Sequence, residues 1–199
     1  MNPTATSLLD LGAPAEELAR LAGAVTDAQL AAPTPCLFPV GTLINHVLGL
    51  CVAFTDAAAK VEGPTTTTPP DATATPLPVG WRDEVVPRLE ALASAWRQPD
   101  AWQGLAWAGG VQMPGAVMGV VANNELVLHG WDLARSTGQD FHVDAANLEA
   151  SWQMVSGTPA DPAAREGLFG PVVPVPADAP LLDRVLGGAG RDPRWSPPA

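Results

Sequence analysis

The chain has 199 residues, of which 47% are hydrophobic and 16% charged, and its formal net charge is -11. This length and apolar fraction predict one ordinary globular domain and exclude a disordered or collagen-like chain. The acidity excludes a nucleic-acid partner, which needs a face of clustered cations, because Lys60 is the only lysine and the arginines are scattered. The same scarcity of cations argues against a partner in an anionic membrane.

The cysteines and the N-terminus indicate the expected compartment. Cys36 and Cys51 form no CxxC pair, so the sequence predicts neither a disulfide framework nor a thiolate zinc site. The first ten residues, MNPTATSLLD, lack a signal-peptide pattern, and no apolar run approaches the ~18 residues of a membrane span. We therefore expect a cytoplasmic protein without a membrane segment.

The first half of the chain predicts two helices and a loop. Apolar residues recur every three or four positions over 8–25 and again over 40–60, which is the spacing of a helix with one buried stripe. A proline-rich link at 32–39 separates the two helices. Residues 61–80 have no such period and are expected to form an exposed linker loop.

Two more long helices are expected in the middle of the chain. A third apolar stripe covers 81–96, with Pro87 near the helix start or at a kink. Pro114 and Gly138 are typical of the opening and of the left-handed cap of a helix, so they predict a long helix between them. Four substantial helices without a convincing strand pattern favour an all-α chain, folded as an antiparallel four-helix bundle.

The C-terminal part is expected to add to this bundle. Asp144 is suited to cap a fifth, shorter helix over 144–155, and another short helix is expected around 181–186. A single extended VPVP segment at 173–176 cannot make a sheet. We therefore predict one domain over 1–199 with a single core, in which 157–199 is a C-terminal extension that packs on the bundle.

Three polar side chains are candidates for a metal site. Glu125 and His129 are four residues apart, so their side chains lie one turn apart on one helix face. His46 lies at the edge of the apolar stripe of 40–60. Two histidines and one carboxylate with an open position suit zinc, nickel or ferrous iron. A structural interpretation stays open, because glutamate and histidine at this spacing are often simple hydrogen-bonded neighbours.

Other side chains show weaker patterns. Asp132 follows His129 by three residues and is a candidate either to orient that histidine or to pair with Arg135 on the surface. Trp102 and Trp107 precede the long helix. These tryptophans either cover the end of the bundle or form the wall of a pocket above the metal.

Cys36 and His142 are further candidates. Cys36 is expected to be a small buried hydrophobic residue, with a reactive thiol as the alternative. His142 follows the predicted helix cap and is expected on the surface, with a remote alternative role as a fourth ligand or proton shuttle. No Ser-His-Asp spacing, P-loop or GxGxxG motif indicates a serine hydrolase or a nucleotide enzyme.

Three stretches of the chain together resemble one known family. They are, in order, TPCLFPVGTLINHVLGL at 34–50, NELVLHGWDLARSTGQD at 124–140 and FGPVVPVPADAPLLDRVLGGAGRDPRW at 169–195. The combination resembles the DinB-like superfamily, in particular the actinobacterial branch related to the N-terminal domain of mycothiol-dependent maleylpyruvate isomerase. The chain departs from that pattern at Phe38, where the family has tryptophan.

The resemblance implies a four-helix bundle that holds a divalent metal through His46, Glu125 and His129, with zinc or nickel expected first and iron second. It also implies a thiol S-transferase or isomerase that uses a low-molecular-weight thiol such as mycothiol, because metal coordination lowers the pKa of a thiol. The expected partner is this thiol or a small-molecule substrate, and a homodimer is an open alternative.

Two other functions stay open. The same bundle would also suit a non-catalytic protein that binds a metal or a small molecule, or a secondary-metabolism enzyme that works without metal. An open metal position favours the enzyme, whereas a closed site with four protein ligands favours the binding protein.

Overall fold

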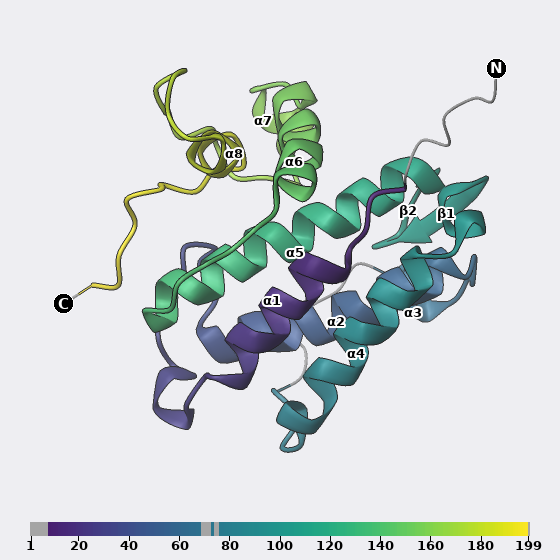
Figure 1. Ribbon diagram of the computed structural model, residues 1–199, viewed down its shortest axis with the longest axis horizontal. Helices are drawn as coiled ribbons and strands as arrows, with labels where there is room; N and C mark the ends of the chain where they lie inside the picture. The colour runs from purple at the N-terminus through teal and green to yellow at the C-terminus, as the bar shows by residue number, and fades with distance from the viewer. Residues whose placement is uncertain (1–7, 69–72, 74–75, 199) are drawn as a thin grey trace.

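The computed structural model describes residues 8–68, 73 and 76–198, which are mostly helical with one small sheet (Figure 1). The α-helices are α1 Gly12–Gly23, α2 Val40–Ala58, α3 Pro64–Thr67, α4 Trp81–Trp96, α5 Gly115–Thr137, α6 Ala145–Gly157, α7 Pro162–Arg165 and α8 Leu181–Gly188. Short 3-10 helices lie at Asp27–Gln29 and Pro99–Trp102, and the strands are β1 Leu105–Ala108 and β2 Val111–Pro114.

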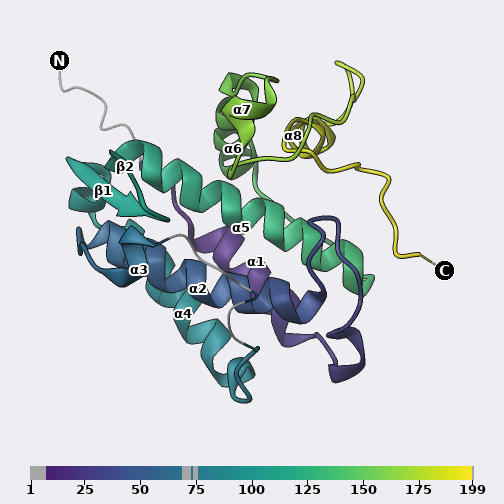
Figure 2. The same ribbon diagram turned by 180° about the vertical axis from the view of Figure 1, so that it is seen from behind.

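Four of the helices enclose the main core. Helix α1 packs against α4 and α5, and α2 packs against the same two helices. Figure 2 shows the molecule from behind, with α5 running along the length of the molecule. Helices α1, α2 and α4 lie on one side of α5. The largest fully buried side chains come from all four helices and include Leu18, Leu43, Leu89 and Met118. Pro87 lies inside α4, which continues through it to Trp96.

Helix α2 is apolar because it is a core helix. By length and composition it is the one helix in the described part of the chain that would be able to cross a membrane. Its residues Leu43, Ile44 and Val47 are instead buried in the main core, against the other helices. The core therefore accounts for its composition.

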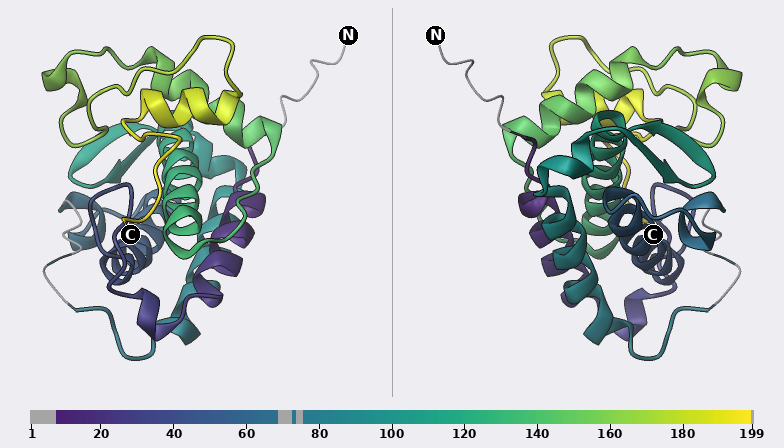
Figure 3. Two further views of the ribbon diagram at one scale, coloured as in Figure 1. Left: turned by 90° about the vertical axis from the view of Figure 1, so that its left-hand side faces the viewer. Right: turned by 90° about the vertical axis from the view of Figure 1, so that its right-hand side faces the viewer.

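Helix α5 is buried on two sides. Leu128 and Trp131 pack with Val155 of α6 and with Val185 and Leu186 of α8 in a second, smaller apolar cluster. Figure 3 shows α6 and α8 together on the side of α5 that faces away from α1 and α4. The expectation of a single core was therefore wrong. Apolar residues lie on both faces of α5, so the spacing of its sequence does not show a second apolar stripe as separate from the first.

The ends of α5 and the start of α6 confirm the local sequence signals. Helix α5 begins directly after Pro114, and Gly138 ends it with a φ of 71°, in the left-handed region. The Asp144 side chain accepts a hydrogen bond from the backbone N–H of Asn147, which caps α6. Both signals act within one turn, so the packing of the rest of the chain does not alter them.

A β-hairpin precedes α5 and corrects the expectation of a chain without strands. Strands β1 and β2 pair antiparallel, with Ala108 opposite Val111. Gly109 and Gly110 form the two-residue turn, with φ of 57° and 79°. Such a turn needs positive φ at both residues, which glycine adopts without strain. The glycine pair was a usable signal, but four-residue strands are too short to show alternation.

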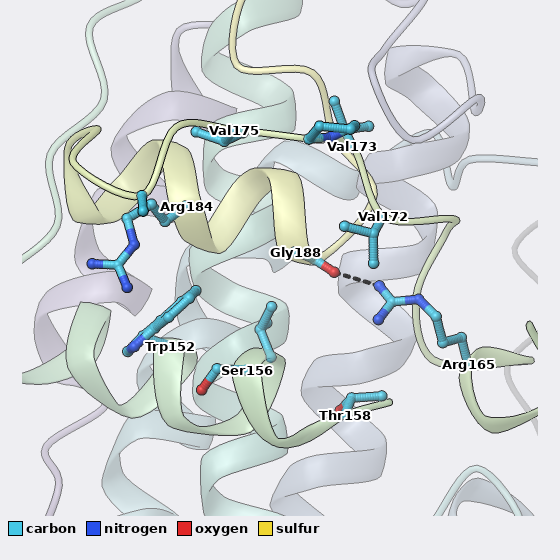
Figure 4. A pocket seen from close by; sticks show the side chains of 12 residues that line it. Trp152, Ser156, Thr158, Arg165, Val172, Val173, Val175, Arg184 and Gly188 are labelled. Atoms are coloured by element: carbon cyan, nitrogen blue, oxygen red, sulfur yellow. Dashed lines mark hydrogen bonds between the residues drawn. The ribbon is translucent and has the colours of Figure 1, made fainter. Parts of the chain in front are cut away.

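The C-terminal part encloses a cavity of about 400 Å³ between α6, α8 and the extended segment 172–177 (Figure 4). Segment 172–177 is not a strand. Buried Arg165 holds this region together, because its guanidinium donates to the carbonyls of Gly170 (2.8 Å) and Gly188. None of the candidate metal ligands lines this cavity.

We expect the substitution Gly138→Ala to lower the free energy of unfolding by about 1–2 kcal/mol, because a residue with a Cβ is strained in the left-handed conformation. Gly23→Ala is the matched control, since Gly23 also ends a helix and also has open space around it. That variant should be unchanged or more stable by about 0.5 kcal/mol. Urea unfolding measures both, and equal effects would contradict the role given to the cap.

Candidate functional site

Glu125 and His129 lie on the side of α5 that meets α2, and His46 of α2 faces them. The Oε2 atom of Glu125 is 3.0 Å from Nε2 of His129 and 4.0 Å from Nε2 of His46. The two imidazole rings are perpendicular, with centroids 5.1 Å apart. The structure thus brings these three side chains together, with ligand atoms within 4.8 Å of one another.

The second ring nitrogen of His129 faces Asp132. Nδ1 of His129 is 3.1 Å from Oδ2 of this carboxylate, which is fully buried. Arg191, in the segment after α8, donates to both carboxylate oxygens, from Nη2 at 3.0 Å and from Nε at 3.4 Å. Asp132 therefore contacts the histidine and not Arg135, which donates instead to the carbonyl of Trp195.

The pKa values of the two histidines are shifted in opposite directions. Burial, helped by the charge of His129 and opposed by Glu125, lowers the pKa of His46 to about 4. Burial also disfavours the charged form of His129, but hydrogen bonds with Asp132, Cys36 and Glu125 raise its pKa well above the ordinary value. The surroundings of His46 thus disfavour its charged form, whereas Asp132 and Glu125 stabilise the charged form of His129.

The pKa values of both carboxylates are lowered, although Asp132 is fully buried and Glu125 is half-buried. Burial alone would raise the pKa of Glu125, but the hydrogen bond and charge of His129, helped by His46 and Arg191, lower it overall. Burial would likewise raise the pKa of Asp132, and the charge of Arg191 with the hydrogen bond of His129 outweighs it. An ionised carboxylate and a neutral imidazole are the forms in which these groups bind a metal.

Cys36 lies beside His129, contrary to the expectation of a small buried hydrophobic residue. Its side chain is half-buried, and its Sγ atom is 3.1 Å from Oγ1 of Thr34. Cys36, His129 and Asp132 form a second group of ligand atoms within 4.8 Å of one another. The sequence signal was the cysteine ten residues before His46, but its relation to α5 depends on the tertiary fold.

A cavity of about 690 Å³ opens at this group. Its walls come from the loop before α2, the β1–β2 hairpin, the facing sides of α2 and α5, and the segments before and after α8. All three candidate ligands line it, together with Cys36 and Arg191. The volume is typical of a pocket for a small organic molecule.

Trp102 and Trp107 are not among the residues that line this cavity. Nε1 of Trp102 donates to the carbonyl of Trp96 (2.7 Å), and the two indole rings meet edge to face. Trp102 therefore covers the end of the main core, and Trp107 is half-buried on β1. The hairpin residues that do line the cavity include Val111 and Met113.

Two other polar residues lie apart from the cavity wall. His142 is exposed in the loop after α5, where its backbone N–H donates to Oε1 of Glu17 (2.9 Å). Asn124 is fully buried, and its amide group makes no hydrogen bond within the described part of the chain, for which the fold offers no reason.

We expect the substitution Arg191→Met to lower the free energy of unfolding by about 3–5 kcal/mol, because it leaves the buried Asp132 carboxylate without its cation. Arg194→Met is the matched control on the same segment. Arg194 is exposed and pairs with Asp192 on the surface, so its loss should change the free energy of unfolding far less. Chemical denaturation measures both, and equal small losses would show that Asp132 does not depend on Arg191.

Comparison with known proteins identifies the family. The family model described as the mycothiol maleylpyruvate isomerase N-terminal domain matches residues 11–134. The crystal structure of the mycothiol-dependent maleylpyruvate isomerase is similar, with 19% identity and a TM-score of 0.57 over 73% of this chain and 66% of that one.

A variant of that enzyme, with one histidine replaced by alanine, gives 18% identity and a TM-score of 0.54 over the same shares. The match therefore spans a little less than two thirds of the solved isomerase, and none of the curated proteins matches this sequence. At these identities the solved structures show the fold alone. The family model, in contrast, covers well over half of the chain, so the chain belongs to the mycothiol maleylpyruvate isomerase N-terminal domain family.

Proposed function

We propose that the protein is a divalent-metal-dependent enzyme of the DinB-like, mycothiol-dependent transferase and isomerase type. The observation that supports this proposal is the convergence of Nε2 of His46, Nε2 of His129 and Oε2 of Glu125 at the wall of a cavity that would hold a small molecule. Zinc or nickel is the expected metal, and ferrous iron is the alternative.

The donor set fits such a metal. Two imidazoles and one carboxylate are typical of catalytic zinc sites and of non-haem iron sites that keep positions open for substrate. The contact of His129 Nδ1 with Asp132 is an arrangement typical of a metal-bound histidine. Cys36 is not grouped with His46 and Glu125, which supports a site with three protein ligands and an open position.

The side chains around the three candidate ligands would support a metal at this open position. A metal held there would supply Lewis acidity that lowers the pKa of a thiol. Asp132 keeps Nε2 of His129 directed toward Glu125, and Arg191 balances the charge of Asp132. Phe54 and Met118 add apolar surface to the cavity wall beside this position.

The family supports the finer parts of the proposal. We propose mycothiol, or a related low-molecular-weight thiol, as the partner, a cytoplasmic location, and a DinB-like four-helix bundle formed by α1, α2, α4 and α5. The isomerisation of maleylpyruvate is the activity of the solved enzyme. For this chain we propose the broader class, transfer or isomerisation that uses an activated thiol or substrate.

A non-catalytic metal-binding protein is the second candidate. The observation in its favour is Cys36, whose thiol lies beside His129 and would close the site as a fourth ligand. Cobalt substitution separates the two cases. A sulfur-to-cobalt charge-transfer band that disappears in Cys36→Ser would support the closed site, and its absence would support the open one.

We expect protein purified without chelator or affinity metal to contain roughly one zinc, nickel or iron ion per chain. The double variant His46→Ala, His129→Ala should lose this metal, whereas His142→Ala, which removes the third histidine of the chain, should keep it. Elemental analysis measures all three. If the wild type holds no metal and takes up none when it is added, the metal-independent enzyme becomes the better hypothesis.

Catalysis itself is tested with mycothiol and a chromogenic aryl halide as the electrophile. Metal-loaded wild type should consume the thiol, and His129→Ala should lower the rate by more than ~100-fold, since even an outer partner of a ligand contributes ~10- to 100-fold. Circular dichroism checks that the helical content is unchanged. A wild type that binds metal but transfers no thiol to any electrophile class would favour the non-catalytic protein.

A further inference from the structure

We propose that the cavity beside His46, Glu125 and His129 binds a neutral, apolar organic substrate and discriminates against dicarboxylates. This assignment of a substrate class rests on the proposed function, because it names what the same site would act on. The cations, the walls and the rim of the cavity each support it.

The cavity lacks a free cation. The chain has ten lysine and arginine side chains, all within the described residues, and only Arg191 lines this cavity. Its Nη2 and Nε donate to Asp132, and its Nη1 donates to the carbonyl of Ala189 (3.2 Å). Apart from the metal proposed at His46, Glu125 and His129, a substrate with two carboxylates would find no unpaired cation in the wall, so at most one of its carboxylates would be neutralised there.

The walls away from the candidate ligands are apolar. They are formed by side chains of α2, α5 and the hairpin, among them Leu50, Phe54, Met113, Val121 and Leu128. A neutral apolar ligand gains free energy in proportion to the apolar area that it removes from water against such walls. A carboxylate would lose its hydration there without gaining a hydrogen-bond donor, which is unfavourable.

Large apolar side chains stand exposed at the mouth of the cavity. Leu37 is 93% exposed, Val111 53% and Leu168 49%, and all three line the cavity. They come from three separate segments: the loop before α2, the hairpin and the segment after α7. Exposed apolar side chains that gather around one opening are typical of a ligand-binding groove.

Leu37 is also held in an unfavourable backbone conformation. Its φ of 72° lies in the left-handed region, which is strained for a residue with a Cβ. The loop enforces this conformation, because Oγ1 of Thr34 donates to the carbonyl of Phe38 (2.6 Å) and the N–H of Val40 donates to the carbonyl of Ala32 (2.9 Å). Strain that keeps a leucine in solvent at the mouth of a cavity points to a contact with a ligand.

The shape favours a small molecule over a second protein as the occupant. The three exposed residues line a concave space of about 690 Å³, and pockets of roughly 300–1,000 Å³ bury most of a small organic molecule. The expected substrate is therefore a branched or aromatic electrophile without ionised groups.

Fluorescence titration with N-phenyl-1-naphthylamine, a neutral probe that brightens in apolar surroundings, tests this substrate class. We expect saturable binding to the full chain, with or without added zinc. In competition, 2,6-dimethylnaphthalene should displace the probe at least ten times more effectively than naphthalene-2,6-dicarboxylate, which has the same ring system. Equal displacement, or stronger displacement by the dicarboxylate, would overturn the proposal.

Variants locate the probe. Leu37→Asn and Leu168→Asp should each weaken its binding at least five-fold. Leu37→Asn should not lower the stability of the fold, because asparagine adopts the left-handed conformation more readily than leucine. Val172→Asp is the control, since it places a carboxylate in the wall of the C-terminal cavity and should leave binding unchanged.

Three results would count against the proposal or separate it from the proposed function. Weakened binding in Val172→Asp alone would place the probe in the C-terminal cavity. Unchanged binding in Leu37→Asn and Leu168→Asp, with a shift toward monomer in sedimentation, would assign the rim to contacts between copies of the chain. Wild type treated with a chelator should still bind the probe, so a failure of the metal proposal would leave the substrate class intact.

Discussion

The buried carboxylate of Asp132 is the contact on which the geometry of the site depends. An ionised group inside a protein is tolerated only when it is paired and hydrogen-bonded, and here one side of the carboxylate meets His129 while the other meets Arg191. The orientation of a candidate ligand on α5 is thereby coupled to a residue near the end of the chain. Arg191 lies outside the stretch of 11–134 that matches the family model, so the site depends on a contact from beyond the matched domain.

The double burial of α5 explains why its few polar side chains are informative. A helix covered by other helices on both sides retains polar groups mainly where they have partners, and the buried amide of Asn124 is the exception on α5. Asn123 shows this on the α6 side, where its amide donates to the carbonyl of Asn147 (2.9 Å) and to Oγ of Ser151 (3.1 Å). On the α2 side, Glu125 contacts His129, and His46 lies beside them. The polar positions of α5 therefore sort into one set that joins helices and one set that faces the cavity.

Local signals were sufficient for most of the helices. The helices expected over 40–60 and 81–96 are Val40–Ala58 and Trp81–Trp96 in the structure, because apolar spacing is set by the helix itself. The proximity of Glu125 to His129 was also predictable, since residues four apart share a helix face.

The contacts that complete the site were not predictable in this way. Arg191 follows Asp132 by 59 residues, and no spacing rule links them. The hairpin was missed because its strands are short, although Gly109 and Gly110 marked the turn. The second apolar cluster was missed because α5 packs against helices on both of its faces. Its apolar residues then no longer recur with the period of a single buried stripe, and only the tertiary structure separates the two faces.

The segments that form the cavity walls differ in how freely their sequences are able to change among relatives. Loops and hairpins carried on a rigid scaffold tolerate replacement when they hold no buried charge. The β1–β2 hairpin and the tip of the loop at Leu37 contribute only apolar surface to the cavity, so their sequences are able to change and reshape the opening while the helices persist. The segment after α8 has no such freedom, because Arg191 balances the charge on which His129 depends. Relatives with different substrates should therefore differ first at the hairpin and last at this arginine.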